Sequence, residues 1–146
     1  MRKAVLLLLA LASAASGVVA DDQQDCMQSK DLDLQIKACT DVIDRDGKAA
    51  WALTARGVAY NNKHDYDRAV SDYEKAIEIN PQDAGTYNWR GIAYHRTSKF
   101  DRAIADFTKA LEIDSAYYYA YNNRALSLHH KREFARAMAD FDRRSR

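Results

Sequence analysis

The chain has 146 residues, of which 47% are apolar and 29% charged, a composition that suits one small folded domain. One proline and five glycines leave little scope for a β-rich or disordered chain, so helix is the expected structure. The formal net charge is +1 and no basic cluster occurs, so the charge gives no reason to expect a nucleic-acid partner.

The first part of the chain, residues 1–20, has the layout of a secretory signal peptide. Arg2 and Lys3 precede an unbroken apolar run from Ala4 to Ala12, and small side chains lie three residues and one residue before a cut after Ala20. A retained membrane anchor is the alternative, although a spanning helix needs about 20 strongly apolar residues and this stretch contains serine and glycine towards its end. We predict an exported protein, in a bacterial periplasm or secreted, with no membrane contact after cleavage.

Residues 21–49 are less regular than the rest of the chain. Leu32, Ile36 and Ile43 are spaced to share one face of a helix, and a short helix is expected before them. We predict a degenerate leading helix pair that caps the units that follow, since the end unit of a helical array presents a more polar outer side.

Both cysteines of the chain, Cys26 and Cys39, lie in this leading segment. In an exported chain an even number of cysteines indicates a disulfide, which here would close a loop of about 14 residues and stabilise the fold by about 3 kcal/mol. Two buried thiols are the alternative. A zinc site is not expected, because no histidine or second cysteine pair lies nearby.

From residue 50 onwards the sequence repeats with a period of 34 residues. The period defines a unit at 50–83, a unit at 84–117 and a partial unit at 118–146. Small and aromatic residues recur in register: Gly57, Gly91 and Ala125; Tyr66, Phe100 and Phe134; Ala69, Ala103 and Ala137; Tyr73, Phe107 and Phe141. Apolar spacing within the first unit predicts one helix over about 50–62 and a second over about 66–79.

The phrases Arg56–Tyr60 and Tyr66–Val70, followed by Ala76-Ile77 and Asn80-Pro81, resemble the tetratricopeptide repeat (TPR). The resemblance extends over residues 50–146. It implies an all-α fold, a right-handed α-solenoid of antiparallel helix pairs (a TPR superhelix) whose concave face binds proteins or peptides. The sequence departs from the family pattern at Ser115, which replaces the terminating proline, and in its third unit, which stops inside the second helix.

In this architecture the first helix of each pair lines the inner face, and helical spacing predicts which side chains point inward. The predicted peptide-binding groove consists of Trp51, Thr54, Val58, Asn61, Asn88, Trp89, Ile92, His95, Tyr119, Asn122, Asn123, Leu126 and His129. Aromatic anchors and amides suit the capture of a peptide backbone. For each aromatic taken singly, a role in packing is the alternative.

Members of this family that hold C-terminal carboxylates use basic and amide side chains along the inner face. The matching positions in this chain are uncharged: Thr54, Val58, Trp89, Tyr119 and Asn123. A carboxylate clamp is therefore not expected, and an extended peptide with apolar side chains fits better.

One polar pattern repeats with the units. An arginine precedes the small residue of each first helix (Arg56, Arg90 and Arg124), and an aspartate recurs in each second helix (Asp72, Asp106 and Asp140). A contact that repeats with the framework belongs to the framework, so we predict structural ion pairs or helix-end hydrogen bonds.

The sequence contains no constellation for catalysis. None of its four histidines is placed beside a nucleophile and a carboxylate, and no phosphate loop or metal-ligand spacing occurs. We predict no enzyme activity, no cofactor and no metal. The predicted function is an exported scaffold that binds a protein or extended peptide. The alternative is self-association into a homo-oligomer through Phe134, Met138 and Phe141 of the unfinished last unit.

Overall fold

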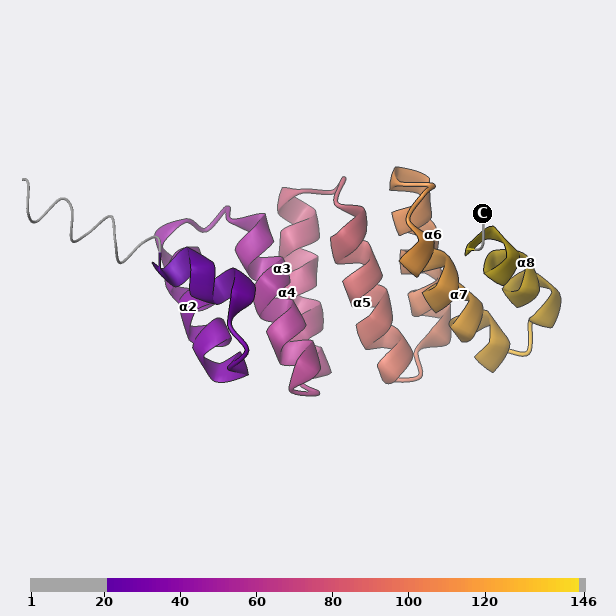
Figure 1. Ribbon diagram of the computed structural model, residues 1–146, viewed down its shortest axis with the longest axis horizontal. Helices are drawn as coiled ribbons and strands as arrows, with labels where there is room; N and C mark the ends of the chain where they lie inside the picture. Colours follow the sequence, from indigo (N-terminus) through magenta and orange to yellow (C-terminus); the bar gives the residue numbers. More distant parts are fainter. Residues whose placement is uncertain (1–20, 145–146) are drawn as a thin grey trace, which may run out of the picture.

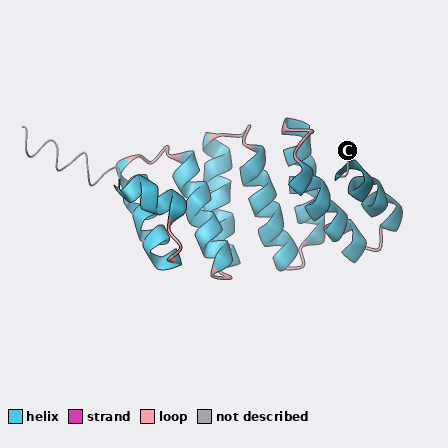
Figure 2. Ribbon diagram, viewed as in Figure 1, coloured by secondary structure: helices cyan, strands magenta, loops and turns pink. Residues whose placement is uncertain are grey.

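The computed structural model describes residues 21–144. The predicted signal peptide lies outside these described residues. Within them the chain consists of helices and the short turns between them, and no strand occurs (Figure 2). No helix in the described part of the chain is long and apolar enough to span a bilayer.

Eight helical segments follow one another along the described chain. Residues 21–28 are helical, and the remaining helices are α2 (Leu32–Arg45), α3 (Ala50–Asn62), α4 (Tyr66–Ile79), α5 (Ala84–Arg96), α6 (Phe100–Ile113), α7 (Tyr118–His130) and α8 (Phe134–Arg144). They stack in chain order into an elongated array, with α2 near one end and α8 at the other (Figure 1). The fold is an α-solenoid of antiparallel helix pairs, which confirms the predicted fold class.

The two helices of a unit approach closely because one of them contributes a glycine. A Cβ added to Gly57 on α3 would lie 2.6 Å from Cε1 of Tyr73 on α4, and one added to Gly91 on α5 would lie 2.6 Å from Cε1 of Phe107 on α6. Both rings are fully buried. The absence of a side chain thus provides the space that each ring fills, which fixes how the two helices pack.

A buried arginine–aspartate pair joins the two helices of each unit, which confirms the predicted framework role. Arg56 donates two hydrogen bonds of 2.8 Å to Asp72. The corresponding bonds in the next two units, from Arg90 to Asp106 and from Arg124 to Asp140, are 2.7–2.8 Å long. The hydrogen bonds to the aspartates raise the pKa of all three arginines.

The turn between the two helices of each unit adopts a left-handed conformation at one residue. His64, Ser98 and Arg132, spaced 34 residues apart, have φ values of 62°, 58° and 64°. In each turn the amide that follows this residue bonds back to a carbonyl in the last helical turn, as from Asp65 to Tyr60 at 2.9 Å. None of the three is glycine, so each turn is strained.

The leading segment covers the first face of α3. Cys26, Cys39, Val42 and Ala52 share one buried cluster, and the two Sγ atoms lie 2.08 Å apart, at disulfide distance. Gln35 adds a hydrogen bond of 2.9 Å from its side-chain amide to the carbonyl of Cys26. The described cysteines are therefore next to one another in the core of this segment.

Candidate peptide-binding groove

A groove of about 430 Å³ lies on the face made by the first helices of the units. The residues that line it come from α3, α5, α6 and α7: Asn61, Asn62, Trp89, Ile92, His95, Arg96, Phe107, Asn123 and Leu126. Six of the residues predicted for the groove are among them: Asn61, Trp89, Ile92, His95, Asn123 and Leu126.

These six residues form three pairs that are related by the 34-residue period. Ile92 and Leu126 occupy one repeat position, Trp89 and Asn123 a second, and Asn61 and His95 a third. The groove thus lies across neighbouring units, because equivalent positions of successive first helices face the same side.

The apolar part of the groove is formed by Trp89, Ile92 and Leu126. Trp89 packs against the buried cluster that contains Tyr73, so the indole is held by the core while it also lines the groove. Leu126 is 43% exposed. A rigid aromatic surface beside an exposed aliphatic side chain is suited to an apolar anchor of a ligand.

The polar part of the groove includes an unpaired buried acceptor. Asn61, in the last turn of α3, is 8% exposed, and its Oδ1 atom has no hydrogen-bond partner among the described residues. Buried polar groups in folded proteins are nearly always paired, so an unpaired one marks a place where a partner is expected.

Asn123 and His95 belong to a connected hydrogen-bond network. Nδ2 of Asn123 donates to Oδ1 of the buried Asn88 at 3.0 Å. Nδ1 of His95 lies 2.8 Å from Oγ of Ser127, which donates its own proton to the backbone carbonyl of Asn123 at 3.1 Å. Since that proton is used, Nδ1 of His95 is the donor, and Nε2 of the neutral ring is an acceptor.

His95 is held neutral by its surroundings. Burial lowers the pKa of His95, and the nearby His130 and Arg96 lower it further. The His95 ring lies 5.2 Å from that of His130 and 5.4 Å from that of Phe100, both measured between centroids. At neutral pH the groove side of α5 therefore carries an uncharged imidazole.

Three predicted groove residues of the first two units lie in packing contacts and are not brought into the groove. Oγ1 of Thr54 is bonded to Oγ1 of Thr86 at 2.7 Å. Val58 is half-buried against the cluster of Tyr73, and Asn88 is 3% exposed. Their direction along the first helices is the predicted one, but neighbouring helices cover them.

The remaining predicted residues lie away from the groove. Trp51 is 40% exposed and lines a separate depression at the junction with α2. Tyr119 is exposed, with its ring 3.9 Å from that of Tyr118. Asn122 is half-buried, and the exposed His129 contacts the ring of Phe134 at 5.3 Å.

Sequence reasoning missed three lining residues, Asn62, Arg96 and Phe107. Asn62 and Arg96 occupy equivalent repeat positions, each directly after a predicted residue at the end of a first helix. The period could have identified them. Phe107 lies on a second helix and is fully buried, so its contribution follows only from the packing of α6 behind α5.

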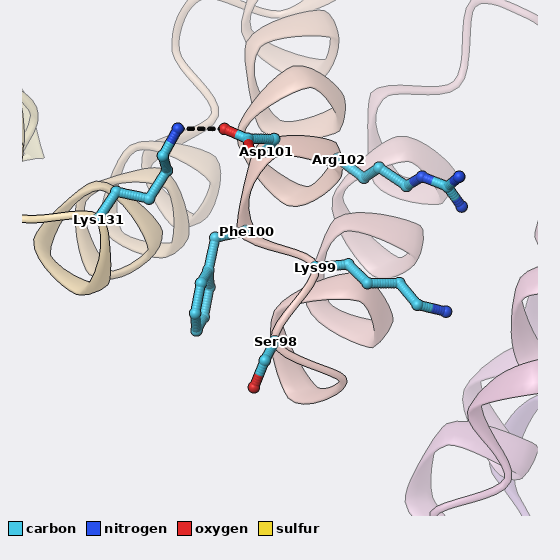
Figure 3. A pocket seen from close by; sticks show the side chains of 6 residues that line it. All are labelled: Ser98, Lys99, Phe100, Asp101, Arg102 and Lys131. Carbon is cyan, nitrogen blue, oxygen red and sulfur yellow. Dashed lines mark hydrogen bonds and ion pairs between the residues drawn. The ribbon is translucent and has the colours of Figure 1, made fainter.

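A larger depression of about 560 Å³ lies beside the start of α6. Its lining residues are Ser98, Lys99, Phe100, Asp101, Arg102 and Lys131 (Figure 3). Figure 3 shows Lys131 and Asp101 turned towards each other in an ion pair, with Lys99 and Arg102 extending away on the other side. These charges are paired or solvent-exposed, so the depression does not form a second candidate site.

The described residues contain no group of three or more histidine, cysteine or acidic side chains that could hold a metal ion. A helical repeat array with a groove across its first helices defines a class of protein, the repeat scaffold. The family model for the tetratricopeptide repeat matches residues 50–83 and 84–117. The chain is a tetratricopeptide repeat protein.

Solved structures of other repeat proteins share the fold. A crystal structure of MamA protein superposes with a TM-score of 0.80 at 20% identity, covering 94% of this chain and 74% of that one. The second TPR of Spaghetti (RPAP3), bound to the HSP90 peptide SRMEEVD, gives 0.65 at 24% identity, with 69% and 94% covered. The Arabidopsis OM64 TPR domain gives 0.65 at 29% identity, with 66% and 80% covered. No curated protein sequence matches the chain.

Proposed function

We propose that this chain is an exported, non-catalytic scaffold that binds a protein or an extended peptide in the groove between its first helices. The observation that supports it most is the combination of an apolar surface at Trp89 and Leu126 with the unpaired buried acceptor of Asn61. The RPAP3 domain, which shares the fold, is bound to a peptide. A groove that offers an anchor surface and an unmet hydrogen bond gains free energy when a peptide occupies it.

Photocrosslinking in the native compartment tests this function. A photoreactive side chain at Leu126, which is exposed in the groove, should capture a partner, whereas one at Lys75, exposed on α4, should not. Trp89→Ala should reduce the yield at Leu126 about tenfold, since loss of a buried aromatic anchor weakens binding by at least about 1.4 kcal/mol. Equal capture from both positions, or no effect of Trp89→Ala, would contradict the proposal.

Export is part of the proposal and has its own support. Residues 1–20 have the composition of a signal peptide, and Cys26 and Cys39 lie at disulfide distance, which suits an oxidising compartment. Mass spectrometry of the protein from its native cell should give an N-terminus at Asp21 and a mass with both thiols oxidised. An intact Met1 with free thiols would reject export.

Self-association is a second candidate, supported by the last helix. Val70 and Ile104 are half-buried under the following unit, whereas the equivalent Met138 on α8 is 65% exposed. The occupant that we propose is a second copy in head-to-tail contact. Residues 21–49 contain eight acidic and four basic residues, and residues 118–146 contain three acidic and seven basic ones, so the two ends of the array carry opposite charge.

Light scattering over a range of concentrations tests self-association. The wild-type chain should form oligomers that dissociate at high salt, because screening weakens attraction between opposite charges. Met138→Glu should give a monomer, while Ile79→Glu, a change at another exposed aliphatic residue, should not. A monomer at every concentration would remove this candidate.

A further inference from the structure

We propose that the groove takes a short, uncharged peptide segment in extended conformation, which packs a large apolar side chain against Trp89 and Leu126 and donates a backbone N–H to Oδ1 of Asn61. This inference rests on the proposed function, because it names the chemical class of the segment that the groove binds.

The unpaired oxygen of Asn61 requires a donor. Asn61 is more than nine-tenths buried and lines the groove, and its Oδ1 has no partner in the described part of the chain. An acceptor that is removed from water without a hydrogen bond destabilises the unoccupied state. A ligand N–H that reaches this oxygen removes that penalty, so binding is favoured by more than the bond alone.

The other polar groups of the groove also favour donors. His95 uses Nδ1–H on Ser127, which leaves the acceptor Nε2, and Asn123 uses Nδ2 on Asn88, which leaves the acceptor Oδ1. An ionised carboxylate has acceptors and no donor, so it cannot bond to these oxygen and nitrogen atoms. The backbone N–H groups of a peptide can.

The charges of the groove do not compensate an acidic ligand. Arg96 is the one permanently charged residue among the nine that line it, and it is exposed at the end of α5. A buried carboxylate needs a partner for its charge, and an acidic tail would need several. The peptide in the RPAP3 structure, SRMEEVD, has three acidic side chains. This groove is therefore matched to a different, uncharged class of segment.

The extended conformation follows from where the donors of a peptide lie. In a helix the backbone N–H groups are bonded internally, whereas an extended segment presents them sideways, with side chains alternating between two faces. A segment that donates to Asn61 and also inserts a side chain beside Trp89 must therefore be extended. The groove volume of about 430 Å³ suits a short stretch with one or two large apolar side chains.

Selection from a displayed library of random heptapeptides on the full chain, with counter-selection on the Trp89→Ala variant, tests the class of ligand. We expect the retained peptides to be enriched in aromatic and large aliphatic residues and depleted in Asp and Glu. Retained peptides enriched in acidic residues, or in Lys and Arg, would overturn the inference.

Backbone N-methylation of a retained peptide tests the bond to Asn61. One N-methyl position should weaken binding to the wild-type chain by about 3- to 10-fold, the range expected for one hydrogen bond. The same position should have no effect on binding to Asn61→Leu or Asn61→Ala, since the acceptor is absent. Asn62→Leu, a change at the adjacent lining residue, should retain the effect. If no N-methyl position distinguishes wild type from both Asn61 variants, the inference is wrong.

The outcomes separate this inference from the proposed function. Peptides that depend on Trp89 but are charged, or that show no coupling to Asn61, reject the inference and leave the groove as a binding site. A library from which no peptide depends on Trp89 rejects the proposed function and this inference together.

Discussion

The ring of Tyr73 on α4 fills the space that Gly57 leaves on α3, and its hydroxyl oxygen is buried without a hydrogen-bond partner among the described residues. Burial also raises the pKa of Tyr73 well above its ordinary value. The next unit has Phe107 at the same place, against Gly91. The first unit thus contains a hydroxyl group that the packing does not need.

Removal of this hydroxyl should stabilise the fold. Tyr73→Phe is expected to raise the free energy of unfolding by about 1 kcal/mol, because an unpaired buried hydroxyl is destabilising and phenylalanine has the same shape. Tyr66→Phe is the control, since the Tyr66 hydroxyl is bonded to Nδ1 of His64 at 2.9 Å and its loss should give no gain. Urea unfolding followed by circular dichroism measures both. A destabilised Tyr73→Phe would show that the hydroxyl has a partner.

A side chain at the helix-pair contact should destabilise the array. Gly91→Ala places a Cβ 2.6 Å from the buried ring of Phe107, and the resulting overpacking is expected to cost about 1–3 kcal/mol. Gly47→Ala is the matched control, because its added Cβ would meet nothing within 4 Å and its φ is not positive. Thermal unfolding of both variants measures the difference. Equal melting temperatures would show that the helices of a unit have room to separate.

The strained turns offer a second comparison of like substitutions. Ser98 has a φ of 58°, so Ser98→Gly should relieve strain and stabilise the protein by up to about 1 kcal/mol. Ser71 is exposed within α4, where the same change to glycine should instead cost about 0.5–1 kcal/mol. Denaturant unfolding should therefore give shifts of opposite sign. A loss of stability in both variants would contradict the left-handed geometry of the turn.

The neutral state of His95 predicts a pH dependence with a definite sign. Because burial lowers its pKa in the folded chain, the folded state binds fewer protons than the unfolded state does. The stability that depends on neutral His95 is present above the unfolded pKa of about 6.5 and is lost as the pH falls through the lower folded value. In His95→Gln this part of the decrease should disappear, whereas in His129→Gln, which leaves His95 in place, it should remain. Unfolding free energies between pH 7.5 and 5 measure the slope, and an unchanged slope in His95→Gln would refute the assignment.

Periodic features of the sequence predicted the framework well. Arg56 and Asp72 repeat together every 34 residues, and a spacing that is constant in every unit implies a contact within the unit, which the structure shows. The left-handed turns were not predicted, because the usual signal is glycine and the chain has His64, Ser98 and Arg132 there. For Cys26 and Cys39 the sequence left a disulfide and two thiols open, and the structure places their Sγ atoms at bonding distance.

By itself the sequence determined the helical units, their register and the side of each first helix that faces inward, because these follow from local periodicity along one helix. Tertiary structure decided which inward residues remain accessible, because accessibility depends on how the neighbouring pair lies across each helix. Asn88 and Trp89 are adjacent on α5, yet Asn88 is covered and bonded to Asn123 while Trp89 lines the groove. The unpaired oxygen of Asn61 likewise arises from the packing of three units together, which no single helix specifies.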